Sequence, residues 1–203
     1  MNRELIVMSL YSQGLDSAIK RTKCLEYIRP KKVDVALIQE THLKHSDVYR
    51  FQNRYYKCVA HSSATNKMKG VLILFDRKRH FQVEGSDHDD AGRFVFVTTV
   101  INHSKMCFAS IYCPNVPDSN FLSSISKILL DLSEYQLVVG GDFNQVCNSQ
   151  LDRTHVSCHS QTDQQLWRRE TFYSRISVYN IPQNKDVHYH QYSVHCLWSP
   201  LIN

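Results

Sequence analysis

Long hydrophobic runs are missing from this sequence of 203 residues. The apolar run LIVMSL, residues 5–10, is shorter than the core of a secretory signal and far shorter than the roughly 20 residues of a membrane-spanning helix. The seven cysteines are odd in number and scattered, and no C-x-x-C pair occurs among them, which argues against a disulfide framework or a zinc ribbon. We therefore expect a soluble nuclear or cytoplasmic protein with reduced thiols and no membrane partner.

Internal repeats and long flexible linkers are also missing. Apolar residues make up 42% of the chain and aromatic residues 11%, which is enough to bury a core and is not typical of a disordered protein. The net charge of +5 is compatible with a polyanionic partner but does not require one. Hydrophobic periodicity continues to about residue 153 and then fails, so we expect one domain over 1–153 and a divergent, poorly ordered tail over 154–203.

Hydrophobic patterning predicts more strands than helices. Strand-like runs cover 3–11, 33–41, 56–62, 70–76, 94–101, 105–113 and 137–144. The first helix is expected after an N-cap at Asp16 or Ser17, with an apolar face that comprises Ala18, Thr22, Leu25 and Ile28. The second is expected within 116–135, capped by Asp118 or Ser119, with its apolar stripe at Phe121, Ile125, Ile128, Leu129 and Leu132. This mixture predicts an α+β or layered α/β/β/α domain.

The polar segment EGSDHDDAGR, residues 84–93, lies between two of these runs. We expect it to be an exposed loop that joins adjacent antiparallel strands over 70–76 and 94–101. Its cluster of His88, Asp89 and Asp90 is expected to lie in solvent rather than to bind a metal.

Acidic and amide side chains stand where two of the apolar strands end. Glu40 follows the second strand, and Asp142 and Asn144 follow the strand QLVVGG. Each of these residues alone is more often a turn or cap residue, but together they match the needs of Mg²⁺, which takes one or two carboxylates plus water and phosphate oxygens. Asp142 could orient or deprotonate a water, and Asn144, two residues on, would point to the same side.

The segment SIYCPN adds two further candidates. Tyr112 ends an apolar strand, and Asn115 follows Pro114 three residues later. A tyrosine hydroxyl and a carboxamide are good donors to a phosphate in a transition state. The alternative is a tyrosine at the edge of the core followed by an ordinary Pro-Asn turn.

The motifs MSLYSQGL, ALIQETH, SIYCPN and GGDFNQV occur in this order. Together they resemble the endonuclease/exonuclease/phosphatase superfamily, and most closely the apurinic-type, exonuclease III-like endonuclease domain of LINE-type retrotransposons. The resemblance covers residues 5 to 153. Segments such as RTKCLEYIRPKK favour the nucleic-acid branch over the deadenylase, sphingomyelinase and inositol-phosphatase branches.

The resemblance implies a four-layered α/β/β/α sandwich and Mg²⁺-dependent hydrolysis of a phosphodiester in double-stranded DNA, with Mn²⁺ as a substitute ion and no small organic cofactor. Glu40 would bind the metal, Asp142 would position or activate the water with help from Asn144, and Tyr112 and Asn115 would contact the scissile phosphate. The cut would serve retrotransposition or DNA repair. Residues that could meet the DNA backbone are Lys20, Arg21, Lys44 and Lys67.

The sequence departs from this family at two places. Tyr11 stands where the family has an asparagine that helps to order the metal site, and a tyrosine offers no amide oxygen. No Asp-His dipeptide follows residue 153, although the family has one near the end of its domain, so the sandwich is expected to be incomplete at its C-terminus. The histidine-rich tail (His188, His190, His195 and Cys196) fits no zinc signature. We therefore expect an impaired endonuclease, and the alternative is a catalytically dead retrotransposon remnant that at most binds DNA.

Overall fold

The computed structural model describes residues 5–64, 68–113 and 118–143. Within these ranges, β1 (Val7–Tyr11), β2 (Val35–Gln39), β3 (Tyr56–Ser62) and β4 (Val71–Asp76) form one sheet, in the order β1-β2-β4-β3. A second sheet has the order β5-β6-β7-β8, from β5 (Gln82–His88), β6 (Phe94–Ile101), β7 (Ser104–Tyr112) and β8 (Gln136–Asp142). The helices are α1 (Ala18–Ile28), the short 3-10 helix η1 (His45–Arg50) and α2 (Ser119–Asp131).

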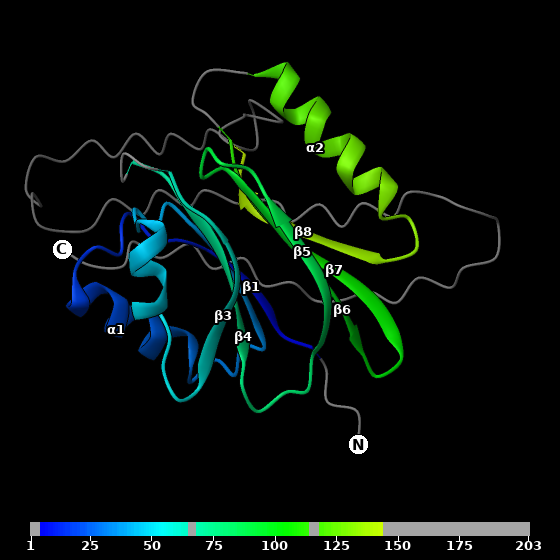
Figure 1. Cartoon of the computed structure of the whole chain (residues 1–203). Coiled ribbons are helices and arrows are strands. Elements are labelled where there is room, and N and C mark those ends of the chain that lie inside the picture. Colours follow the sequence, from blue (N-terminus) through cyan, green and yellow to red (C-terminus); the bar gives the residue numbers. More distant parts are fainter. Residues whose placement is uncertain (1–4, 65–67, 114–117, 144–203) are drawn as a thin grey trace, which may run out of the picture.

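The two sheets face each other, with a helix on the outside of each (Figure 1). β1 and β2 are parallel, as are β7 and β8, whereas the remaining pairs in both sheets are antiparallel. The result is the four-layered α/β/β/α sandwich that the strand and helix pattern predicts. None of the helices in the described ranges is long and apolar enough to cross a membrane.

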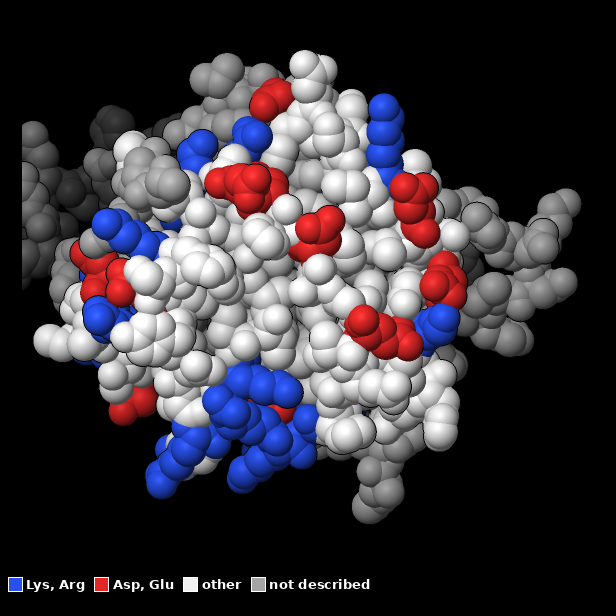
Figure 2. Space-filling model, viewed as in Figure 1, with Lys and Arg blue, Asp and Glu red and all other residues white. Residues whose placement is uncertain are grey.

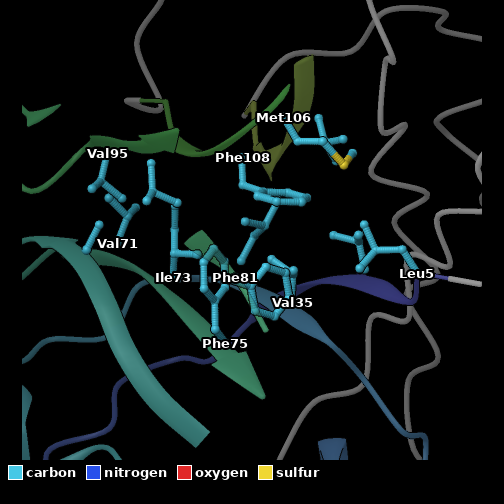
Figure 3. Packing of buried hydrophobic residues seen from close by; sticks show 14 of the residues in the cluster. Leu5, Val35, Val71, Ile73, Phe75, Phe81, Val95, Met106 and Phe108 are labelled. Carbon is cyan, nitrogen blue, oxygen red and sulfur yellow. The ribbon is translucent and has the colours of Figure 1, made fainter. Parts of the chain in front are cut away.

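The central core lies between the two sheets. Ile73 and Phe75 of β4 point across the interface toward Phe108 of β7 and Val95 of β6 (Figure 3). Phe75 stacks on Phe81 with ring centroids 4.1 Å apart and meets Phe108 edge-on at 5.8 Å. A strand that buries both of its faces does not alternate apolar and polar residues, and β2 and β4 are therefore almost continuously apolar.

Each helix seals a second apolar layer on the outer face of its sheet. The stripe of α2 packs on β7 and β8 as its spacing predicts, and the Asp118 side chain accepts a hydrogen bond from the Phe121 amide, 3.0 Å away, so this cap is confirmed. For α1 the expectation is partly wrong. Leu25 and Ile28 are buried with Cys24, whereas Ala18 and Thr22 are exposed, and the N-cap residue Ser17 makes no side-chain cap bond.

The expectation for residues 84–93 is partly wrong, although His88 and Asp90 are exposed as expected. Residues 84–88, half of the segment that the sequence suggests as a loop, belong to strand β5, and the strands at 70–76 and 94–101 do not pair because they belong to different sheets. β5 is an edge strand whose residues are nearly all exposed, so it carries no apolar alternation by which to recognise it. Asp89 is half-buried, and its Oδ1 accepts hydrogen bonds from the amides of Arg93 and Phe94, both at 2.9 Å.

Two consecutive glycines, Gly140 and Gly141, let β8 lie close both to β7 in its own sheet and to β2 in the facing sheet. A Cβ on Gly140 would lie 2.7 Å from Leu37 Cδ1 in the facing sheet, and a Cβ on Gly141 would collide with the backbone carbonyl of Ile111 in β7. The glycines therefore allow the end of β8, with Asp142, to lie close to the ends of β1 and β2.

Gly141→Ala is expected to destabilise the fold by about 1–3 kcal/mol, because the added methyl group meets backbone that no rotamer change can move. The measurement is urea denaturation followed by far-ultraviolet circular dichroism. Gly85→Ala is the matched control, since its Cβ would only meet the Thr98 hydroxyl at 3.4 Å. An unfolding midpoint equal to that of Gly85→Ala would contradict the close approach of β8.

Candidate active site

Four strands end together at one edge of the sandwich. The registers pair Tyr11 with Gln39 at the ends of β1 and β2, and Tyr112 with Asp142 at the ends of β7 and β8. Because β1 and β8 face each other across the sheets, as do β2 and β7, the polar residues at these ends converge on one region. Convergence of strand ends is the usual way in which layered sheets build a ligand site.

A hydrogen bond between Tyr112 and Glu40 joins the two sheets at this edge. The Tyr112 hydroxyl donates to Glu40 Oε1, and Glu40 Oε2 lies 3.9 Å from His42 Nε2. Tyr11 also hydrogen-bonds Glu40, so two phenols from opposite sheets hold one carboxylate. The sequence motifs place Glu40 and Tyr112 in one site, and the fold brings them into contact.

Burial, followed by the hydrogen bond to Glu40, raises the pKa of both Tyr11 and Tyr112 far above the ordinary value. The negative charges of Glu40 and Asp142 act in the same direction on both hydroxyls. Both tyrosines therefore remain protonated and act as hydrogen-bond donors at neutral pH. The shared influence also places Asp142 within electrostatic range of the hydroxyls that hold Glu40.

The backbone at Glu40 adopts a left-handed conformation, with φ of +50°. Such a conformation costs on the order of 1–3 kcal/mol for a residue other than glycine and persists only where surrounding contacts impose it. Here the Gly14 amide donates to the Glu40 carbonyl at 2.7 Å, and the Thr41 amide donates to the Gly70 carbonyl at 3.0 Å. These bonds turn the chain at the end of β2 and fix the direction of the Glu40 side chain.

A buried polar network lies next to the site, between the two sheets. Gln39 is 1% exposed, donates to Ser110 Oγ at 3.0 Å across the sheets, and accepts from Ser9 Oγ at 3.3 Å. Sequence reasoning missed this residue as part of the site. The sequence feature that could have identified Gln39 is its polar side chain at the end of an otherwise apolar strand, next to Glu40.

Asp142 is half-buried at the end of β8. Its carbonyl accepts a hydrogen bond from the Cys113 amide at 2.8 Å, which extends the pairing of β7 and β8 by one residue. Burial and the negative charge of Asp142 raise the pKa of the Cys113 thiol to about 11, so this thiol is neutral and not nucleophilic at neutral pH.

The donor set at this edge fits Mg²⁺ better than a transition metal. The described ranges contain no cluster of three histidine, cysteine or acidic side chains that could hold a metal ion. Glu40 hydrogen-bonds the hydroxyls of Tyr11 and Tyr112, and the negative charge of Asp142, the register partner of Tyr112, acts on both hydroxyls. Mg²⁺ is commonly bound by one or two carboxylates and completes its shell with water and phosphate oxygens. A carboxylate has about four acceptor positions, so Glu40 retains capacity beside its tyrosine bonds.

The remaining predicted residues lie in different places. Lys20 and Arg21 donate to backbone carbonyls of the loop that joins β1 to α1, at the same end of the sandwich as Glu40. Lys44 is exposed and immediately precedes η1. DNA contact by these three residues stays a prediction. Asn115, Asn144, Lys67 and the whole tail over 154–203 lie outside the described residues.

Three histidines form a further cluster at this end, on the side of β3 and β5. The ring centroids of His45 and His61 are 4.8 Å apart, and those of His61 and His88 are 6.5 Å apart. Burial, followed by the positive charges that His45 and His88 acquire on protonation, lowers the pKa of His61. Sequence reasoning did not identify this cluster, because its members come from three separate elements.

His61→Gln is expected to reduce the loss of stability on acidification. A histidine whose pKa is lowered by folding stabilises the protein above its unfolded pKa of about 6.5, and this stability is lost as the pH falls below that value. The urea midpoint should therefore fall less between neutral pH and about pH 5 in the variant than in the parent protein. His80→Gln, which removes an exposed histidine outside this cluster, is the matched control.

The arrangement of two facing mixed sheets flanked by helices is shared with several solved structures. Solved structures with this fold include TDP2 of D. rerio in complex with a single-strand DNA product, with 15% sequence identity, a TM-score of 0.54, and coverage of 71% of this chain and 62% of that one. The endonuclease domain of TRAS1, a telomere-specific non-LTR retrotransposon, has 16% identity and a TM-score of 0.50, with 69% of this chain and 59% of that one covered.

A mannosyl-6-phosphatase of Bacteroides thetaiotaomicron also shares the fold, at 12% identity and a TM-score of 0.53, with 74% of this chain and 67% of that one covered. At these identities the likeness shows the fold alone. The chain spans about six tenths of the length of the TDP2 and TRAS1 structures. No protein-family model matches the sequence.

Proposed function

We propose that the chain is a Mg²⁺-dependent phosphodiester hydrolase that cuts double-stranded DNA, with an activity impaired relative to a complete site. The observation that carries this proposal is the hydrogen bond from Tyr112 to Glu40 across the two sheets, with Asp142 beside Tyr112 in the strand register. Glu40, Tyr112 and Asp142 come from the ends of three different strands and lie together at one edge of the fold.

Asp142 is the general base of this proposal. Its carboxylate would orient a water and accept its proton as the water attacks the phosphorus atom, and Asn144 would help to hold the same water. Tyr112, which burial keeps protonated, has a single O–H donor; with the substrate bound it would exchange its hydrogen bond to Glu40 for one to a non-bridging phosphate oxygen and so stabilise the charge that develops there. Asn115 would contact the same phosphate.

Glu40 would hold the metal ion. When bound, Mg²⁺ would offset the negative charge of the phosphate and lower the barrier to attack. The left-handed backbone at Glu40 and its contacts with Tyr112 and His42 fix where the carboxylate lies before substrate arrives.

DNA is the substrate that the motifs favour. The TRAS1 domain is an endonuclease of a retrotransposon, and the structure of D. rerio TDP2 contains single-strand DNA. Both share the fold of this chain, which supports a retrotransposon-derived endonuclease of the apurinic type. The chain would act in the nucleus or the cytoplasm.

A catalytically dead remnant that at most binds DNA is the second candidate, and Tyr11 favours it. The Tyr11 hydroxyl hydrogen-bonds Glu40, at the position where the family has an amide. A phenol held against the carboxylate competes with a metal ion for the same oxygen atoms.

The test is a nicking assay on supercoiled plasmid and on a duplex that contains one abasic site. The full-length chain is incubated with Mg²⁺, with Mn²⁺ or with a chelator, and the products are separated by electrophoresis. Slow nicking that requires a divalent ion supports the hydrolase. Retention of DNA without nicking under all three conditions supports the remnant.

A further inference from the structure

Lysine and arginine side chains gather at one end of the molecule, at the bottom of the view in Figure 2. Three connections contribute them: the segment between α1 and β2, the turn that precedes β3, and the turn between β4 and β5. We call this set the basic patch, and its members are Arg29, Lys31, Lys32, Arg54, Arg77, Lys78 and Arg79. All of them are exposed except Arg79, which is half-buried.

The strand registers place the basic patch at the end opposite to the candidate active site. β2 begins at Val35, which pairs with Phe75 near the end of β4, and it ends beside Glu40. β3 begins at Tyr56, which pairs with Asp76, the last residue of β4. The residues before β2 and β3 and those after β4 therefore lie together, a full strand length away from Glu40.

Specific contacts hold the three connections together. The guanidinium groups of Arg29 and Arg54 lie over the ring of Tyr55, at 3.9 and 4.8 Å from its centroid. Arg77 Nε donates to the carbonyl of Asn53 at 2.8 Å, which fixes the β4–β5 turn against the turn before β3. The basic patch is thus formed by side chains on an ordered base.

Few acidic groups balance this charge. Asp34 is completely buried and lies 3.6 Å from Arg79, so this pair neutralises one cation of the seven. Asp76 is directed to its own turn, where Oδ1 accepts from the Lys78 amide at 2.9 Å. The chain carries a net charge of only +5, so much of its positive excess is concentrated at this one end.

No large apolar side chain is exposed in the three connections, and this decides the kind of partner. The large exposed apolar residues within the described ranges are Ile19, Tyr49, Met68, Val83 and Leu130, and none belongs to the three connections. A membrane-binding surface would add apolar side chains for insertion between lipids. Cations on short ordered loops, without apolar groups, suit a regular array of phosphates such as a nucleic-acid duplex.

We propose that the basic patch is a second nucleic-acid surface, which binds the phosphate backbone of a duplex independently of its sequence. It lies opposite to the candidate active site, so the chain can hold one duplex segment there while a second segment occupies the site. This surface does not depend on the proposed hydrolase activity, because none of its residues lies near Glu40 or Asp142.

The experiment measures binding of the full-length chain to a fluorescein-labelled DNA duplex by anisotropy, in chelator so that no cleavage occurs. The patch variant carries Lys31→Gln, Lys32→Gln and Lys78→Gln. The matched control carries Lys23→Gln, Lys105→Gln and Lys127→Gln, which removes the same charge from exposed lysines outside the three connections that form the basic patch. Each binding constant is measured at several salt concentrations, and unfolding midpoints confirm that both variants are folded.

The patch variant should bind the duplex about 100-fold more weakly near 0.1 M salt, and its slope of log K against log salt should be lower by about three, one for each lost phosphate contact. The control variant should bind like the parent protein. Equal weakening in the two variants, or no weakening in either, overturns the proposal. Binding to anionic phospholipid vesicles that depends on the same three lysines, with duplex binding unchanged, also overturns it.

The hydrolase function and the second nucleic-acid surface can fail separately. If the chain does not nick plasmid but shows the salt dependence described above, the hydrolase function is overturned and the second surface is supported. If the chain nicks plasmid but its duplex binding does not depend on the patch lysines, the hydrolase function is supported and the second surface is overturned.

Discussion

Asp142→Asn should reduce the rate of Mg²⁺-dependent DNA nicking by about 10²–10⁴-fold, the range typical of a lost general base. The substitution keeps the size and shape of the side chain and removes its charge and basicity. Asp142 stands at the end of β8, where its carbonyl continues the pairing with β7, so an isosteric change leaves the strand intact. Nicking rates under single-turnover conditions measure the effect, and duplex binding in chelator should change little.

The matched control is Asp131→Asn, an exposed aspartate at the end of α2. It removes the same charge from the protein far from the strand ends and should nick like the parent chain. A parental rate in Asp142→Asn would mean that the water is activated elsewhere and that this edge of the sandwich is not the catalytic site.

The layered architecture could be predicted because each of its layers leaves a mark in the sequence. The continuously apolar runs of β2 and β4 reflect burial on both faces, and the stripe of α2 reflects burial on one. β5 left no such mark, since an exposed edge strand gains its hydrogen bonds from β6 while its side chains remain in water. Its absence from the prediction led to the wrong pairing of the strands at 70–76 and 94–101.

The candidate site was predictable where a residue is both polar and placed at a strand end. Glu40, Tyr112 and Asp142 meet this description, and the fold brings all three to one edge. Gln39 and the histidine cluster were missed because their partners come from distant segments: the hydrogen bond of Gln39 with Ser110 spans 71 residues. The basic patch was missed for the same reason, since its short basic runs at 29–32 and 77–79 are far apart in the sequence and only the fold brings them together.

The structure adds a contact to what the sequence indicates about Tyr11. The sequence alone indicates a lost amide oxygen at this position. The structure adds that the phenol is not merely inert, because it hydrogen-bonds Glu40 and shares that carboxylate with Tyr112. The proposed impairment would therefore have a physical cause at the candidate metal ligand itself.

Tyr11→Asn should strengthen the response to Mg²⁺ by about 10- to 100-fold, measured as the ion concentration that gives half the maximal nicking rate. The change removes one donor from Glu40 and introduces an amide oxygen, the kind of ligand that a hard cation takes. A hydrogen bond to a charged group contributes roughly 1.5–3 kcal/mol, and this range corresponds to the stated factor.

Tyr11→Phe separates the two contributions of the substitution. It keeps the ring, which packs partly against the central core, and removes the hydroxyl that holds Glu40. An intermediate gain is therefore expected, larger than in the parent protein and smaller than in Tyr11→Asn. Urea midpoints of both variants are needed as well, because asparagine loses the packing of the ring and lowers the fraction of folded protein. If neither variant changes the Mg²⁺ response while Asp142→Asn still abolishes nicking, Tyr11 does not obstruct the metal ligand. The proposed impairment would then need a cause other than Tyr11.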